Sequence, residues 1–186
     1  MIRSQSSSKA PEPPKQTPSK EPFAWPCDRE RITLAYGAYW KNVYTPANPH
    51  MGLDTAPYPG SQGEPAYSPI TGVVSRVVYS STGLGNHVKV TGVCNSYVSA
   101  RNINGDWIEL NRGEPYTMIL AHLDSISVKQ GQKIAAGQTV GAIGSTGFSF
   151  APHIHWELHL KGQRCNALDF AIQQKPEIED KVIYSG

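Results

Sequence analysis

Short apolar runs rich in Val, Ile, Tyr and Thr, separated by Gly, Pro and Asn, fill the chain from Phe23 onward. No window of helical length keeps a 3.6-residue apolar period, and many short runs with turn residues between them are typical of antiparallel strands. The pattern predicts an all-β domain with one helical turn, at Leu168–Gln173. The expected strands are Arg31–Tyr36, Ile70–Tyr79, His87–Thr91, Trp107–Leu110, Tyr116–Leu120, Thr139–Ile143 and His153–Leu160.

The last of these runs alternates between two kinds of side chain. Because successive side chains of a strand point to opposite faces, its apolar residues should pack into the core and its polar residues should open towards a cleft. The apolar set is Ile154, Trp156, Leu158 and Leu160, and the polar set is His153, His155, Glu157 and His159. The first two histidines then point the same way, about 6.5–7 Å apart. That spacing allows one of them or both to bind a metal, so the alternation alone does not assign the ligand.

Length and charge restrict the classes of protein to consider. The 186 residues suit one domain with a sizeable core. Residues 1–21 are rich in Ser, Pro and Lys, and we expect a flexible tail there, followed by a domain over residues 22–186. The tail contains the whole formal net charge of +2, so the domain lacks the basic surface of a nucleic-acid-binding protein. No run has the length of a transmembrane segment, and no signal-peptide core is visible near Met1.

The three cysteines, Cys27, Cys94 and Cys165, are far apart and lack C-x-x-C spacing. This spacing excludes a cysteine-based zinc knuckle and a redox motif. One disulfide with a free thiol and three buried thiols are both compatible with the sequence.

Candidate chemistry is concentrated in histidines. His50-Met51-Gly52-Leu53-Asp54 forms one cluster, His153-Ile154-His155 forms another, and His122 ends an apolar run between them. Three nitrogen or oxygen ligands plus an open position for water are the usual composition of a hydrolytic zinc site. We therefore expect metal-assisted attack of water on an acyl group. No H-E-x-x-H motif is present, so the sequence does not indicate the glutamate that acts as general base in zinc proteases with that motif.

Taken in order, these motifs resemble the lysostaphin/LytM-like family of zinc endopeptidases. The resemblance covers roughly Phe23 to Phe170 and implies an antiparallel two-layer β-sandwich with a cleft that carries the metal. The matching elements are His50, Gly52 and Asp54 as H-x-G-x-D, Gly72-Val73-Val74, Gly85-Asn86, Ala121-His122-Leu123, the Gly-Gln turns at Gly131 and Gly137, Gly144-Ser145-Thr146-Gly147 and Pro152-His153-Ile154-His155.

The resemblance also implies roles for single residues. His50, Asp54 and His155 would bind Zn²⁺, and His122 and His153 would be the catalytic histidines, with the choice of base left open. The substrate would be a peptide bond of bacterial peptidoglycan, in the stem peptide or the cross-bridge. The enzyme would act in the cell wall or periplasm, secreted or virion-associated, with the tail as a tether to a larger assembly.

Two other classes of protein share some of these features. Some family members have lost ligands and act as cell-wall-binding or activator scaffolds, but the ligand set is complete here. A lipoyl- or biotinyl-type carrier domain would explain the Gly-Gln turns. It would leave the histidines unexplained, and Lys129 and Lys133 lack the sequence context of a modified lysine.

The chain departs from the family pattern in two places. The family usually makes one tight hairpin between Gly85-Asn86 and Ala121-His122, whereas this chain adds roughly Gly92–Glu114. Such an insertion would either shape specificity beside the cleft or form an ordinary extra hairpin. Phe148-Ser149-Phe150-Ala151 stands where the family tends to have small and hydroxyl residues, which leaves the substrate peptide open.

Overall fold

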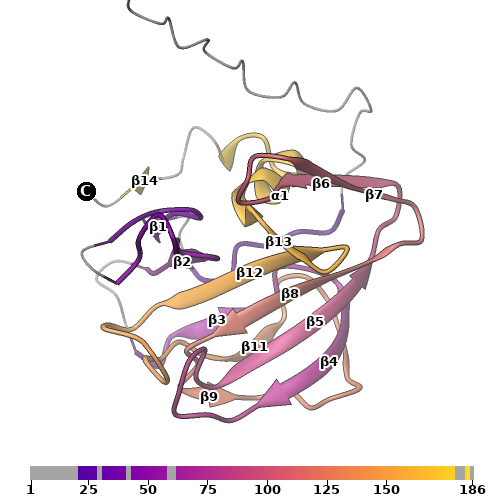
Figure 1. The fold of residues 1–186 in the computed structure, drawn as a ribbon. Coiled ribbons are helices and arrows are strands. Elements are labelled where there is room, and N and C mark those ends of the chain that lie inside the picture. Colours follow the sequence, from indigo (N-terminus) through magenta and orange to yellow (C-terminus); the bar gives the residue numbers. More distant parts are fainter. Residues whose placement is uncertain (1–20, 29–30, 41–42, 58–61, 179–182, 185–186) are drawn as a thin grey trace, which may run out of the picture.

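A large sheet forms the centre of the molecule (Figure 1). The computed structural model describes residues 21–28, 31–40, 43–57, 62–178 and 183–184, and the sheet has nine strands within these ranges. Its neighbouring strands are antiparallel, except that β1 and β14 are parallel. In order across the sheet they are β10 (Lys133–Ile134), β4 (Gly72–Val78), β5 (His87–Val93), β8 (Pro115–Ala121), β12 (Ile154–Leu160), β2 (Leu53–Thr55), β1 (Arg31–Leu34) and β14 (Ile183–Tyr184), and β13 (Gln163–Cys165) also pairs with β12.

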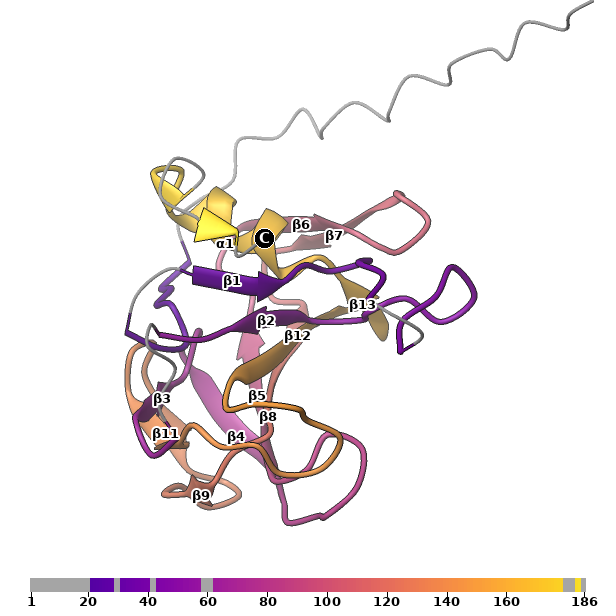
Figure 2. The same cartoon turned by 90° about the vertical axis from the view of Figure 1, so that its left-hand side faces the viewer.

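A second, smaller sheet covers part of one face of the large sheet (Figure 2). It consists of β3 (Pro65–Tyr67), β11 (Thr139–Ala142) and β9 (Ser125–Ile126). Ala66 and Val140 of the small sheet share one buried core with Val74, Val88 and Trp156 of the large sheet. The fold is therefore the antiparallel two-layer β-sandwich that the sequence predicted.

The strands expected from the apolar runs are all present, with ends displaced by no more than two residues. The expected helical turn is the helix α1 (Ala167–Gln174), which begins after Asn166, whose Oδ1 accepts a hydrogen bond from the backbone N–H of Leu168 at 3.1 Å. No helix of the described residues is long and apolar enough to cross a membrane. The shorter strands, such as β2 and β3, carry no apolar run that would have revealed them.

The alternation along β12 is confirmed on its apolar face and only partly on its polar face. Ile154, Trp156, Leu158 and Leu160 are completely buried in the core. On the other face, His153 lines a cleft, but Glu157 is buried instead of opening towards it. The expectation that the whole polar face opens to a cleft was wrong, because neighbouring polar side chains cover Glu157.

The added segment between β5 and β8 forms a hairpin of β6 (Tyr97–Arg101) and β7 (Trp107–Asn111), which packs on α1 (Figure 1). The carboxylate of Asp169 in α1 accepts hydrogen bonds from Nε of Arg101 at 2.9 Å and from its Nη2 at 2.6 Å. It also accepts one from the backbone N–H of Arg101 at 2.9 Å. Gln173 Nε2 donates to Ser99 Oγ at 2.8 Å. The hairpin is therefore fastened to the helix by charged and amide groups.

The described fold begins with a buried residue, Glu21. Its backbone N–H donates to Gln174 Oε1 at 2.6 Å, and its carboxylate accepts from the backbone and side-chain N–H groups of Asn95. These contacts connect Glu21, the last residue of the expected tail, to the domain. Residues 1–20, the rest of the expected tail, lie outside the described residues.

The three cysteines are buried thiols. Burial raises the pKa of the Cys27 thiol to about 12 and that of the Cys165 thiol to about 11. Because the thiolate is the reactive form, these thiols are chemically inert at neutral pH. Of the two alternatives that the sequence allowed, the structure has the three buried thiols.

We expect the Asp169–Arg101 contact to stabilise the fold measurably. Asp169→Ala removes a buried acceptor of four hydrogen bonds, three of them from Arg101, and should lower the free energy of unfolding by about 2 kcal/mol. For a chain of this size the melting temperature should fall by roughly 4–8 °C, measured by circular dichroism. Glu177→Ala changes an exposed carboxylate close to the same helix and serves as the control. Equal melting temperatures for the two variants would contradict the expectation.

Candidate metal centre

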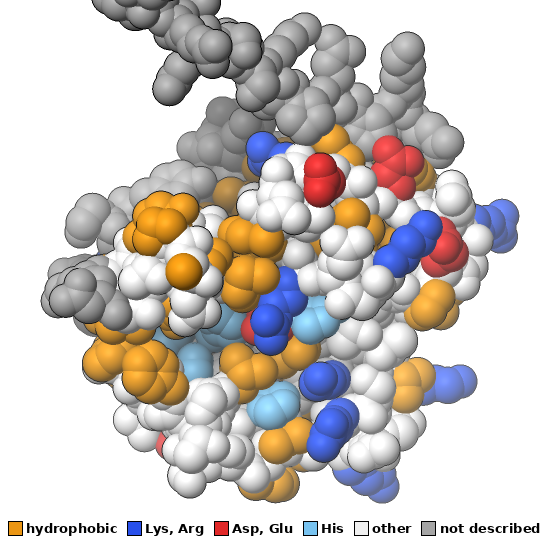
Figure 3. Space-filling model, viewed as in Figure 1, with side chains coloured by type: hydrophobic (Ala, Val, Ile, Leu, Met, Phe, Trp, Pro, Cys, Tyr) orange, Lys and Arg blue, Asp and Glu red, His pale blue; other side chains and the backbone are white. Residues whose placement is uncertain are grey.

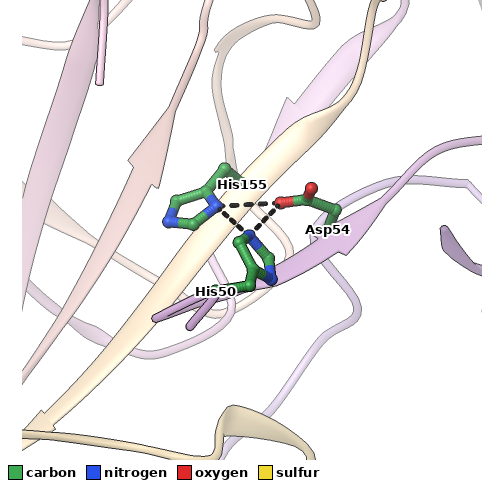
Figure 4. Close-up of side chains that lie close together, drawn as sticks. All are labelled: His50, Asp54 and His155. Atoms are coloured by element: carbon green, nitrogen blue, oxygen red, sulfur yellow. Dashed lines mark hydrogen bonds and ion pairs between the residues drawn. The ribbon is translucent and has the colours of Figure 1, made fainter. Parts of the chain in front are cut away.

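Three candidate ligand atoms meet between β2 and β12 (Figure 4). The pairing of these strands places His155 directly opposite Asp54, and His50 lies just before β2. His155 Nδ1 is 2.8 Å from Asp54 Oδ1 and 2.9 Å from His50 Nε2. His50 Nε2 is 3.1 Å from Asp54 Oδ1. The fold thus brings together the three residues that the resemblance implied as ligands.

Hydrogen bonds on the far side of each imidazole set which nitrogen faces the cluster with a lone pair. A carbonyl oxygen only accepts, so His50 Nδ1 donates to the Ala35 carbonyl at 3.0 Å, and neutral His50 keeps its lone pair on Nε2. Glu157 Oε1 lies 3.4 Å from His155 Nε2 and in the same way favours a lone pair on His155 Nδ1. Two lone pairs and a carboxylate oxygen then face one another, and they repel unless a metal cation or a proton lies between them.

The donor set fits a zinc ion. Donors held at about 2.0–2.1 Å from Zn²⁺ in a tetrahedron lie about 3.3 Å from one another. The observed separations of 2.8–3.1 Å are slightly shorter than this value. Two imidazole nitrogens and one carboxylate oxygen are common zinc ligands, and they leave a fourth position for water.

The charges of the cluster favour a bound cation as well. Burial alone would raise the pKa of Asp54, but hydrogen bonds with His155 and His50 hold this pKa well below its usual range. Burial alone would lower the pKa of His155, but its hydrogen bonds with Asp54 and Glu157 outweigh that effect and raise the pKa to about 9. The pocket therefore stabilises an ionised carboxylate and positive charge beside it.

Gly52 makes room for the His155 ring. A Cβ added at position 52 would collide with Cε1 and Nε2 of that ring. In a closely packed site a larger residue would have to move the ring, and with it the Nδ1 that faces Asp54. This gives a steric reason for the glycine between His50 and Asp54 in the H-x-G-x-D motif.

His153 and His122 lie beside the three-residue cluster. Their ring centroids are 4.8 Å apart, and the ring of His122 lies 5.7 Å from that of His155. His153 Nε2 is 3.5 Å from Asp54 Oδ2. All five residues singled out in the sequence therefore form one constellation.

Each of these two histidines has one ring nitrogen held by a backbone carbonyl. His122 Nδ1 donates to Thr146 O at 2.8 Å, and His153 Nδ1 donates to Ala151 O at 2.7 Å. In the neutral form both rings then keep a lone pair on Nε2. Burial and the nearby His153 lower the pKa of His122 to about 4, which keeps this imidazole neutral.

His122 takes an uncommon backbone conformation at the end of β8. Its φ is 61°, in the left-handed region that residues other than glycine seldom adopt. Its backbone N–H donates to Leu84 O at 2.9 Å, which helps to hold the turn. Strained residues of this kind are concentrated at functional sites.

A cleft of about 260 Å³ opens beside the histidines. Asp54, His122 and His153 line it together with several aromatic side chains. Trp40 and Phe150 are in edge contact, with ring centroids 5.2 Å apart, and Phe148 contacts Phe150 at 5.3 Å. The departure from the family pattern at Phe148–Phe150 therefore lies at this cleft.

Glu157 is the functional residue that our sequence analysis left without a role. Its Oε2 accepts hydrogen bonds from His159 Nε2 at 2.6 Å and from Arg164 Nε at 3.0 Å, and its Oε1 faces His155. These contacts outweigh burial and hold the pKa of Glu157 well below its usual range. Its position two residues after His155 on the same strand face was the available signal.

Comparisons with known proteins agree with this geometry. The profile of peptidase family M23 matches residues 48–167. The chain is 32% identical over 120 residues to an uncharacterized metalloprotease of Haemophilus influenzae, covering 64% of this chain and 20% of the relative. It is 35% identical over 77 residues to the peptidoglycan DD-endopeptidase ShyA of Vibrio cholerae, covering 41% of this chain and 18% of the relative.

A relative with a different role also matches. The murein hydrolase activator NlpD of Salmonella dublin is 27% identical over 152 residues, which cover 82% of this chain and 32% of the relative. The matches therefore span only 18–32% of the lengths of these three relatives.

Solved structures share the fold. A zinc-containing peptidase from Vibrio cholerae is similar with a TM-score of 0.58 and 27% identity, over 80% of this chain and 40% of that one. The matched family segment contains the donor set of His50, Asp54 and His155, and it covers well over half of the sequence. The chain belongs to peptidase family M23, and its cofactor is Zn²⁺.

Proposed function

We propose that this protein is a zinc-dependent endopeptidase that hydrolyses peptide bonds of bacterial peptidoglycan, in the stem peptide or the cross-bridge. The observation that carries the proposal is the pairing of a three-donor cluster with two further imidazoles on one cleft. His50, Asp54 and His155 would hold the ion, and His122 and His153 would act on the substrate beside it. The similarity to a peptidoglycan DD-endopeptidase supports the substrate class.

In this proposal His122 and His153 transfer protons and stabilise negative charge during hydrolysis. When bound, Zn²⁺ supplies Lewis acidity towards water and a peptide carbonyl. His122 and His153 both offer a lone pair on Nε2 in the neutral form, so either can accept the proton of the attacking water. The other imidazole, when it is protonated on Nε2, can donate a hydrogen bond to the oxygen on which negative charge develops. A protonated Nε2 can then pass its proton to the leaving amine.

Glu157 and Ala35 act as positioning groups in this proposal. The Ala35 carbonyl holds Nδ1 of His50, and the Glu157 carboxylate holds Nε2 of His155, so each ring presents its other nitrogen to the ion. Arg164 and His159 in turn hold Glu157. The aromatic side chains at the cleft would exclude water from the substrate peptide.

A second function, as an activator of other murein hydrolases, is favoured by the similarity to NlpD. An activator needs no metal centre and no pair of free imidazoles. The complete donor set together with His122 and His153 supports the hydrolase over the activator.

We further propose that the enzyme acts in the cell wall or periplasm, either secreted or associated with a virion. The proposal rests on the substrate class. Residues 1–20, which we expect to serve as a tether to a larger assembly, lie outside the described residues.

The proposal predicts zinc-dependent cleavage of purified peptidoglycan sacculi. The zinc-loaded protein should release soluble fragments, and mass spectrometry of these fragments should identify a cleaved peptide bond. Asp54→Ala removes the only charged donor of the cluster and should abolish both zinc binding, measured by metal analysis, and fragment release. Zinc binding without any release of fragments from several peptidoglycan types would favour the activator.

Substitutions of His155 and of His153, which point to the same strand face, should have different effects on zinc binding. His155→Ala removes a proposed ligand, so zinc occupancy and activity should fall together, with a lower melting temperature. His153→Ala and His122→Ala should keep the zinc and lose roughly 10²–10⁴-fold in activity, the usual contribution of a positioned proton-transfer or oxyanion group. If His153→Ala loses its zinc while His155→Ala retains it, the two roles are inverted.

A further inference from the structure

The sheet face that carries His155 continues beyond the metal centre across β8, β5 and β4. The strand register places Glu157 opposite Ile119, Ile119 opposite Lys89, and Lys89 opposite Arg76. These four residues form one row across four strands, two residues along β12 from His155. Figure 3 shows Lys and Arg side chains gathered near the histidines on this face.

A β-bulge aims Arg76 at this face. The register of β4 shifts between Val74 and Arg76, so that Ser75 and Arg76 together oppose Lys89. Val74 is completely buried in the core. In a regular strand Arg76 would share the face of Val74, because side chains alternate. The extra residue turns Arg76 to the exposed side, beside Lys89.

This arrangement leaves two cations facing each other without a carboxylate. Like charges directly opposite one another in an antiparallel pair repel. Within the described part of the chain, no carboxylate oxygen lies within 4.0 Å of the charged groups of Arg76 or Lys89. Glu157, the acid of the same row, already accepts hydrogen bonds from His159 and Arg164. An external anion would relieve the repulsion.

We propose that Arg76 and Lys89 form a subsite for a free carboxylate of an acidic substrate peptide. Lys89 lies two strands from β12 and two residues along it from His155, so strand spacings place the two Cα atoms about 12 Å apart. An extended peptide covers that distance in three to four residues. The subsite would therefore bind a carboxylate three to four residues away from the peptide bond that lies at the metal centre. The inference rests on the proposed function, because stem peptides of peptidoglycan carry carboxyl groups that are free or amidated.

Two peptides that differ only in amidation test this subsite. The zinc-loaded protein is given a cross-linked stem peptide with free carboxylates and its carboxamide analogue, and kcat/KM is measured for each. We expect about tenfold preference for the acid, the size of one charge-assisted hydrogen bond. The double variant Arg76→Gln, Lys89→Gln should lose this preference while keeping its rate on the amide. Arg112→Gln, Lys129→Gln removes the same charge from exposed positions elsewhere and should keep the preference.

Binding of uncross-linked stem peptides, acid and amide, separates this inference from the proposed function. These peptides offer no cross-link to cleave, and calorimetry gives their Kd values for the same three proteins. Mass spectrometry of the titrated samples shows whether a bond of the stem peptide itself is cleaved. A preference for the acid in binding, without cleavage of any cross-linked or uncross-linked peptide, would support the subsite and refute the hydrolase. Equal binding and equal kcat/KM for acid and amide, or a preference that survives in the Arg76, Lys89 variant, would overturn the subsite.

Discussion

The structure depends on one electrostatic constraint, the meeting of three electron-rich atoms at the junction of β2 and β12. His50 Nε2, Asp54 Oδ1 and His155 Nδ1 lie within 3.1 Å of one another, and backbone and carboxylate partners on the far sides aim the two imidazoles inward. Such atoms stay together only when positive charge lies between them. The fold therefore holds a preorganised cation site, and its two imidazole nitrogens and one carboxylate oxygen are donors that zinc accepts.

The sheet supplies the precision that this site needs. Asp54 and His155 occupy opposed positions of two hydrogen-bonded strands, and His155 also pairs with Ala121, the residue before His122. Two of the five residues of the constellation, Asp54 and His155, are thus fixed by backbone pairing, which is stiffer than a loop, and His122 directly follows a paired residue. His50 and His153 lie just outside strands and are held by backbone carbonyl groups. The core face of β12, packed around Trp156, keeps this frame rigid.

Much of this could be predicted from the sequence, for identifiable reasons. The alternation in His153–Leu160 gave the buried face of β12 correctly, because the period of a strand depends only on backbone geometry. The histidine motifs carried the resemblance that assembled the constellation. The burial of Glu157 could not be predicted from the strand pattern, because Arg164 and His159 cover this residue. These contacts depend on tertiary packing. The face to which Arg76 points could not be predicted either, because a bulge in β4 breaks the two-residue period there.

X-ray absorption spectroscopy at the zinc edge of the purified protein tests the central claim most directly. The account predicts one zinc per chain, surrounded by nitrogen and oxygen atoms at about 2.0–2.1 Å, with two imidazole rings visible in the outer-shell scattering. The three buried thiols should contribute nothing to the spectrum. A sulfur ligand at about 2.3 Å, a single imidazole, or protein without zinc after purification in zinc-containing buffer would contradict the account.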